Sequence, residues 1–257
     1  MARLGQTLMA AGSETLQKSR WISGDINDPS PFSIHAGLVI AAYVLNEMHE
    51  ADRPAAEPSA AFSDVPGPRA SSASSDDSSS VAAPLFVADL CTGSGCIACS
   101  IAYEHPRTRV IATDIAPEAV ALARENVDAL GLSDRVRVVQ CYLGQGVPAS
   151  AMGRLDLVVS NPPYVPASVL SEIPREVADF EPALALDGGE DGLDVLRRLL
   201  PWCARALKPG GGAAFELHET RLDEAAALAR AAGFEDARVV PDLAGRPRVL
   251  TVRKPVA

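Results

Sequence analysis

The residue types best suited to chemistry in this sequence stand together in Asn161-Pro162-Pro163-Tyr164, directly after an apolar run. Asn161 offers a side-chain carbonyl and Pro162 a backbone carbonyl at a fixed φ, so two oxygens can accept both protons of one NH₂ group. Tyr164 adds a flat face against which a planar amide or a base can lie. The four residues therefore predict a site that orients a planar NH₂ group, the alternative being a rigid turn after a strand.

A second candidate site is the glycine loop that follows the apolar run 85–90. Gly93 and Gly95 permit backbone angles and a close approach that a side chain would block, and the loop falls where open α/β sheets bind ligands. A dinucleotide site would have the form G-x-G-x-x-G, but its third position here is Ala98, so that alternative fits less well. Ligand contacts are predicted for Asp89, Cys91, Thr92, Gly93, Ser94 and Gly95. For Asp89, the alternative is a turn-forming role.

An acid ends the next apolar run. Asp114 follows the run 110–113, about twenty residues after the glycine loop, and a carboxylate there suits the two hydroxyls of a ribose. The alternative is an acid at the N-terminus of a helix that starts at Pro117. Together, the loop and this acid predict a site for a nucleoside-containing cofactor.

Short apolar runs alternate with helical patterns from residue 84 onward, as in βαβ units. We predict strands at 85–90, 109–113, 136–140, 155–160, 212–217, 237–240 and 248–252. We predict helices at 95–103, 117–130, 168–177, 193–207 and 221–232. The fold class is α/β: a Rossmann-like domain with a seven-stranded, mainly parallel sheet and helices on both faces. In such a sheet the carboxyl ends of parallel strands share one edge, so the three candidate sites should meet.

Composition divides the chain into three parts. Residues 1–50 form a short N-terminal segment in which 35–50 has helical spacing of apolar residues. Residues 51–83 are rich in Ser and Pro and too poor in apolar residues to repay the entropy of ordering, which predicts a disordered linker. Residues 84–257 form the α/β domain.

Charge and cysteine content exclude several classes of protein. The net charge of −10 argues against an extended nucleic-acid surface, so we expect no stable nucleic-acid partner. The five cysteines lack paired C-x-x-C spacing, so neither a disulfide framework nor a metal site is predicted. No apolar run reaches the length of a membrane span. We expect a cytoplasmic monomer.

With these motifs in place, residues 85–253 resemble the HemK/PrmC family of protein-glutamine N5-methyltransferases, which modify the Gly-Gly-Gln glutamine of peptide chain release factors. The resemblance includes two further stretches, 181–194 and 242–246. It implies a class I S-adenosylmethionine (SAM) dependent methyltransferase fold, SAM contacts from Cys91 to Gly95, and ribose binding by Asp114. It also implies that Asn161 to Tyr164 surround the substrate glutamine, with Asn161 beside the methyl donor.

The chain also departs from the family pattern. After the third strand the family usually has an acid near the adenine, whereas this chain has Cys141-Tyr142-Leu143-Gly144. Tyr142 or Leu143 is therefore predicted to pack on the adenine ring instead. The residues before Ala51 are too few for the helical N-terminal domain usual in the family. Three alternatives stay open: a ribosomal-protein glutamine methyltransferase, a nucleic-acid N-methyltransferase, and a catalytically impaired SAM-binding homologue.

Overall fold

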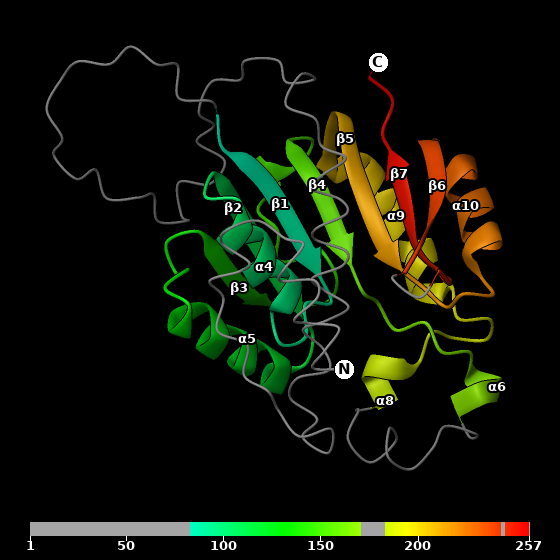
Figure 1. Ribbon diagram of the computed structural model, residues 1–257, viewed down its shortest axis with the longest axis horizontal. Helices are drawn as coiled ribbons and strands as arrows, with labels where there is room; N and C mark the ends of the chain where they lie inside the picture. Colours follow the sequence, from blue (N-terminus) through cyan, green and yellow to red (C-terminus); the bar gives the residue numbers. More distant parts are fainter. Residues whose placement is uncertain (1–82, 171–182, 243–244, 257) are drawn as a thin grey trace, which may run out of the picture.

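A single seven-stranded sheet organises the computed structural model, which describes residues 83–170, 183–242 and 245–256. The strand order is β3-β2-β1-β4-β5-β7-β6, and only β7 runs antiparallel to its neighbours (Figure 1). The strands are β1 (Leu85–Leu90), β2 (Thr108–Asp114), β3 (Val136–Gln140), β4 (Leu155–Ser160), β5 (Leu207–Glu216), β6 (Glu235–Pro241) and β7 (Pro247–Arg253). The predicted seven-stranded, mainly parallel α/β fold is confirmed.

Helices connect the strands on both sides of the sheet. The longer ones are α4 (Cys96–Glu104), α5 (Pro117–Ala129), α9 (Asp194–Ala206) and α10 (Leu222–Ala231). Short turns of helix are η3 (Ala149–Ala151), α6 (Ala167–Leu170) and α8 (Ala183–Leu186). Within the described ranges, no helix is long and apolar enough to cross a membrane.

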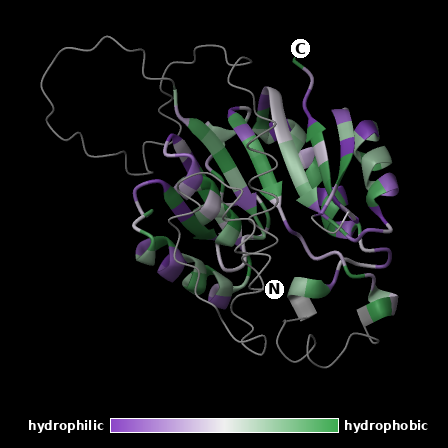
Figure 2. Ribbon diagram, in the orientation of Figure 1, coloured by the Kyte–Doolittle hydropathy of each residue, from purple (hydrophilic) through white to green (hydrophobic). Residues whose placement is uncertain are grey.

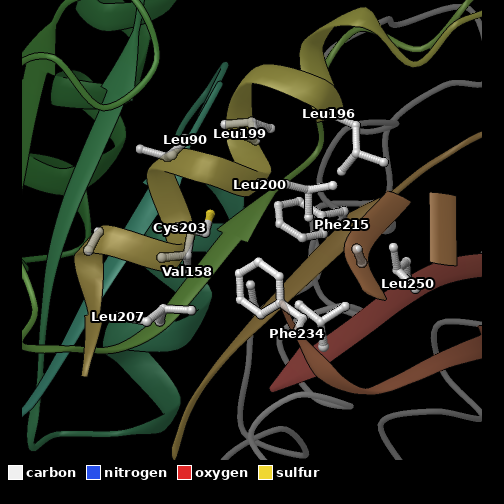
Figure 3. Close-up of a cluster of buried hydrophobic side chains, with 14 of the residues drawn as sticks. Leu90, Val158, Leu196, Leu199, Leu200, Cys203, Leu207, Phe215, Phe234 and Leu250 are labelled. Carbon is white, nitrogen blue, oxygen red and sulfur yellow. The ribbon is translucent and has the colours of Figure 1, made fainter. Parts of the chain in front are cut away.

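Two hydrophobic clusters lie on opposite faces of the sheet because side chains alternate along a strand. Leu90 of β1 joins the cluster beneath α9 and α10, whereas its near neighbour Val87 joins the cluster beneath α4 and α5. Figure 3 shows Leu200 of α9 beside the Phe215 ring of β5 in the first cluster. Figure 2 shows the matching pattern, with hydrophobic strands and helices that carry hydrophilic residues on their outer sides. The sheet is thus a rigid support for the loops at its edge.

An ion pair with a buried carboxylate lies among the first residues of β1, β4 and β5. Asp156 is 7% exposed, and its Oδ2 accepts a hydrogen bond from the Phe86 N–H across 2.7 Å. Its Oδ1 lies 2.5 Å from Lys208 Nζ. These contacts link β4 to both of its neighbours at the edge opposite the loops that follow β1 and β4.

The structure differs from the predicted elements in a few places. Strand β5 starts at Leu207 rather than 212, because Leu207 is fully buried and pairs with Leu155 before the register shifts. Of the predicted helix 168–177, only the part in α6 falls within the described residues. The short helix α8 was not predicted. The predicted helical segment within 1–50 and nearly all of the linker 51–83 lie outside the described residues.

Candidate functional site

The three candidate motifs lie side by side at one edge of the sheet. Leu90, the last residue of β1, is in register with Thr113 of β2 on one side and with Ser160 of β4 on the other. Because these strands are parallel, the segments that follow them leave the sheet together. Ser160 Oγ also donates a hydrogen bond to Leu90 O across 2.6 Å, which fixes the end of β4 against the end of β1.

The glycine loop depends on left-handed backbone angles. Cys91, Gly93 and Gly95 have φ values of 59°, 55° and 79°. A Cβ on Gly95 would lie 3.1 Å from Ala123 Cβ, so the loop packs closely on α5. A Cβ on Gly93 would meet nothing within 4 Å, so this side of the loop is open to a ligand. The geometry suits a loop that brings backbone N–H groups close to a bound molecule.

Asp89 lies beneath the loop and is fully buried. Its Oδ2 accepts hydrogen bonds from Thr92 Oγ1 at 2.6 Å and from the Ala98 N–H at 3.0 Å. Among the described residues its Oδ1 has no hydrogen-bond partner, and burial raises the pKa of this carboxyl from 3.8 to about 7. Asp89 therefore supports the loop and the start of α4 from within, while a direct contact with a ligand stays a prediction.

Asp114 lies at the tip of β2 and is partly exposed. Its Oδ2 accepts the Gly93 N–H across 2.9 Å, and its Oδ1 accepts the Ala116 N–H across 3.0 Å. The second bond orders the chain just before α5, where Ala116 is the N-cap. Each carboxylate oxygen has a further lone pair, so these bonds leave acceptor capacity for a ribose.

The turn after β3 is tied to both β2 and α9. Thr113 Oγ1 donates a hydrogen bond to Leu143 O across 2.8 Å. Leu143 has a φ of 46° and packs on the hydrophobic cluster beneath α9 and α10. The Tyr142 hydroxyl accepts a hydrogen bond from Arg198 of α9. A Cβ on Gly144 would collide with the Trp202 ring. The turn thus lies beside the β2 tip, and the predicted packing of Tyr142 or Leu143 on an adenine stays a prediction.

The tetrapeptide after β4 is partly open. Pro162 is buried, whereas Asn161, Pro163 and Tyr164 are partly exposed. Tyr164 packs against the hydrophobic cluster beneath α9 and α10. Its ring centroid lies 6.5 Å from that of His218, which follows β5. The structure therefore brings Asn161 and Tyr164 to the same edge as the glycine loop and Asp114.

Two residues beyond the predicted set border this edge. His218 Nδ1 lies 2.9 Å from Thr220 Oγ1, which holds the imidazole near the Tyr164 ring. Glu216, the last residue of β5, is 6% exposed, and burial raises the pKa of its carboxyl. His218 is therefore the nearer of the two to the tetrapeptide, through its contact with the Tyr164 ring.

The cysteines around the loop are neutral thiols. Burial raises the pKa of Cys91 to about 12 and that of Cys96 to about 11. Neither thiol is activated as a nucleophile, because the thiolate is the reactive form. Among residues 83–170, 183–242 and 245–256, no three His, Cys, Asp or Glu side chains gather as a metal site would require.

Comparisons with known proteins show what the chain is similar to. Residues 80–175 match the model of the methyltransferase small domain. The chain is 47% identical over 163 residues to the release factor glutamine methyltransferase of Moorella thermoacetica, covering 63% of this chain and 56% of that protein. It is 40% identical over 171 residues to the enzyme of the same name from Cereibacter sphaeroides, covering 66% and 60%. The chain thus spans little more than half the length of these relatives, and over that region the resemblance is confirmed.

Solved structures support the fold. The catalytic domain of hMettl16 superposes with a TM-score of 0.53 at 16% identity, covering 68% of this chain and 65% of that one. A methyltransferase from Pyrococcus furiosus gives a TM-score of 0.50 at 17% identity, covering 87% and 100%. The described domain has the class I SAM-dependent methyltransferase fold.

Proposed function

We propose that this relative of the release factor glutamine methyltransferases transfers a methyl group from SAM to the side-chain amide nitrogen of a glutamine in a protein. The substrate we infer is the Gly-Gly-Gln glutamine of peptide chain release factors. The observation that carries the proposal is the register of β1 with β2 and β4, which brings the glycine loop, Asp114 and Asn161 to one edge. The identity of 47% to a protein named for this activity supports the choice of substrate.

The loop after β1 and the acid at the end of β2 fit a nucleoside-containing methyl donor. Residues Cys91 to Gly95 would receive the donor on the open side of Gly93, where an added Cβ would meet nothing within 4 Å. Asp114 would accept the ribose hydroxyls, since its carboxylate is already held by the Gly93 N–H. Asn126 steadies the same loop because its Nδ2 donates to Ser94 O across 2.8 Å. Asp89 would act from beneath as the support of this surface.

Asn161 and Pro162 would hold the acceptor nitrogen. An amide nitrogen is a weak nucleophile because its lone pair is delocalised into the carbonyl. The Asn161 side-chain carbonyl and the Pro162 backbone carbonyl would each accept one N–H and so turn the lone pair toward the donor methyl. Tyr164 would supply the flat face against which the glutamine amide lies.

Methyl transfer from SAM to the glutamine nitrogen needs neither a metal nor a redox partner. The glutamine nitrogen forms a bond to the methyl carbon as the carbon–sulfur bond breaks, and the electron pair of that bond stays on sulfur, which gives S-adenosylhomocysteine. The nitrogen then loses one proton to water. Because charge on sulfur disperses during transfer, positioning and fixed dipoles supply most of the rate.

We infer that residues 84–257 perform this chemistry as a monomer, with a release factor as a transient partner and no stable nucleic-acid or membrane partner. Release factors act where translation takes place, so we infer a cytoplasmic location.

The test uses the full chain, labelled SAM and a purified release factor. We expect label in the peptide that contains the Gly-Gly-Gln tripeptide, and none when that glutamine is replaced by alanine. A parallel reaction with DNA and one with ribosomal protein should stay unlabelled. Label in DNA or in the ribosomal protein alone would overturn the proposed substrate, and SAM binding without transfer to any of them would indicate an impaired homologue.

A further inference from the structure

The segment 186–192, which precedes α9, is bonded to the chain that follows the tetrapeptide. The Val165 N–H donates to Leu186 O across 2.9 Å, and the Gly188 N–H donates back to Val165 O across 2.9 Å. Val165 and Asp187 form an isolated parallel bridge. A further bond joins the Ala167 N–H to Gly189 O at 2.8 Å. Segment 186–192 therefore holds residues 165–167 much as a neighbouring strand would.

Gly188 packs directly against the main chain of Tyr164. A Cβ on Gly188 would lie 2.7 Å from both the Cα and the carbonyl carbon of Tyr164, which is closer than real Cβ atoms approach. The φ of Gly188 is outside the left-handed region, so the backbone itself would accept other residues. A Cβ added to Gly192 would likewise collide with the Tyr164 carbonyl oxygen. A Cβ on Gly188 would also lie 2.8 Å from Gly192 Cα, so close contacts with Tyr164 and Gly192, and not a left-handed φ, require a glycine at 188.

The other side of segment 186–192 is anchored to α9. Asp191 Oδ1 accepts the Leu193 N–H across 3.0 Å, and the carboxylate also binds the Arg197 guanidinium through both oxygens, at 2.8 and 2.5 Å. Leu193 is fully buried in the cluster beneath α9. The segment is thus a short brace between a helix fixed to the sheet and the main chain of Tyr164.

We propose that segment 186–192 is a positioning element for methyl transfer, in which Gly188 sets the place of the Tyr164 main chain and, through it, that of the Asn161 and Pro162 carbonyls. The coupling is stiff because Pro162 and Pro163 both have a fixed φ. A shift of about 1 Å in a positioned group can cost about a hundredfold in rate. The inference rests on the proposed function, since it assigns Gly188 to the same site.

The main test compares Gly188→Ala with a matched control, Gly212→Ala. Gly212 lies in β5, its φ is also outside the left-handed region, and its added Cβ would meet only Val252 O at 3.6 Å, an ordinary contact. We expect Gly188→Ala to lower kcat by at least about tenfold, with unchanged affinity for SAM and with the control at the wild-type rate. Unchanged kcat in Gly188→Ala, or an equal loss of kcat and of SAM affinity, would overturn the proposal.

Hydrogen exchange provides a readout that does not depend on the substrate. We expect Gly188→Ala to speed amide exchange in a peptide covering 161–167 and to leave a peptide covering 91–95 unchanged, because only the first is bonded to segment 186–192. If the wild-type chain methylates no glutamine, the proposed function fails, and this exchange result alone decides whether the brace exists. Equal exchange rates in the 161–167 peptide of Gly188→Ala and Gly212→Ala would overturn the proposed brace.

A second variant covers the case in which Gly188→Ala does not fold. Arg197→Gln removes the charge that holds Asp191 without adding atoms beside Tyr164. The Arg197 side chain is 39% exposed, so the fold should tolerate its loss. We expect faster exchange in 161–167 and a smaller fall in kcat than in Gly188→Ala, again with SAM affinity retained. No change in either quantity would count against the proposal.

Discussion

The Gly93 N–H donates a hydrogen bond to Asp114 Oδ2 across 2.9 Å, so the carboxylate at the tip of β2 and the loop after β1 are joined without a ligand between them. Asp114 Oδ1 is held in turn by the Ala116 N–H. A cofactor that binds both elements would find them already oriented, and little entropy would be lost in ordering them.

This arrangement predicts the effect of Asp114→Asn. The amide keeps the shape and one acceptor oxygen but removes the charge, and hydrogen bonds to charged groups are stronger than neutral ones. We expect the affinity for SAM, measured by isothermal titration, to fall by about tenfold, which is 1.4 kcal/mol. Asp134→Asn, which removes an exposed carboxylate outside the site, serves as the control. Equal affinities for both variants would show that Asp114 does not touch the donor.

The buried carboxyl of Asp89 predicts a pH dependence of stability. Burial raises its pKa from 3.8 in the unfolded chain to about 7 in the folded one, so the folded state binds the proton more tightly. Stability from this group is present below about pH 4 and is lost as the pH rises through 7. Asp89→Asn should remove that loss, as seen by comparing urea unfolding of the variant and the wild type from pH 4 to 8. If the unfolding free energies of the two chains depend on pH in the same way, burial does not raise the pKa of Asp89.

The ion pair at the other edge of the sheet predicts a separate loss of stability. Asp156→Ala leaves the buried Phe86 N–H without its acceptor, whereas Lys208 is 33% exposed and can be hydrated, so the change should cost about 1–3 kcal/mol of unfolding free energy. Lys208→Met leaves the 7% exposed Asp156 carboxylate without its cation, so it should cost at least as much. Urea unfolding measures both. SAM affinity in the folded protein should not change, and a change would mean that this edge communicates with the site.

The turn after β3 predicts a contrast between two neighbouring positions. Tyr142→Phe removes a hydroxyl whose partner is Arg198 of α9, so SAM affinity should stay at the wild-type value. Gly144→Ala forces a methyl group into the Trp202 ring and should shift the turn, with a cost of about 1–3 kcal/mol in stability and weaker SAM binding. Titration and thermal unfolding of the two variants distinguish them. Weaker binding by Tyr142→Phe would instead point to a hydroxyl that contacts the donor.

Local sequence patterns predicted most of the fold. Strands β1, β3 and β4 begin and end at the predicted residues, because each is a short run rich in Leu or Val. The start of β5 was missed because Pro209 and the glycines after it are typical of a turn. Pairing with β4 nonetheless extends the strand back to Leu207. Tertiary contact, not local preference, decides this boundary.

The meeting of the candidate residues at one edge was predicted for a similar reason. Asp89, Asp114 and Asn161 each stand at or just after the end of an apolar run, and parallel topology brings such ends together. The contact of Gly188 with Tyr164 has no local pattern, since it depends on how a distant loop packs. The bond from Arg198 to Tyr142 likewise joins residues 56 positions apart. Sequence showed which loops meet, and only the structure showed what holds them in place.

The role of Asn161 is tested most directly by replacing it with alanine in the release factor assay while measuring SAM binding in the same preparation. The account predicts that Asn161→Ala binds SAM as the wild type does and leaves the Gly-Gly-Gln glutamine unmethylated, because one of the two acceptors for its NH₂ group is gone. Glu125→Ala, at an exposed position on α5, should retain both properties. Methyl transfer at the wild-type rate by Asn161→Ala, or loss of SAM binding together with transfer, would contradict the account.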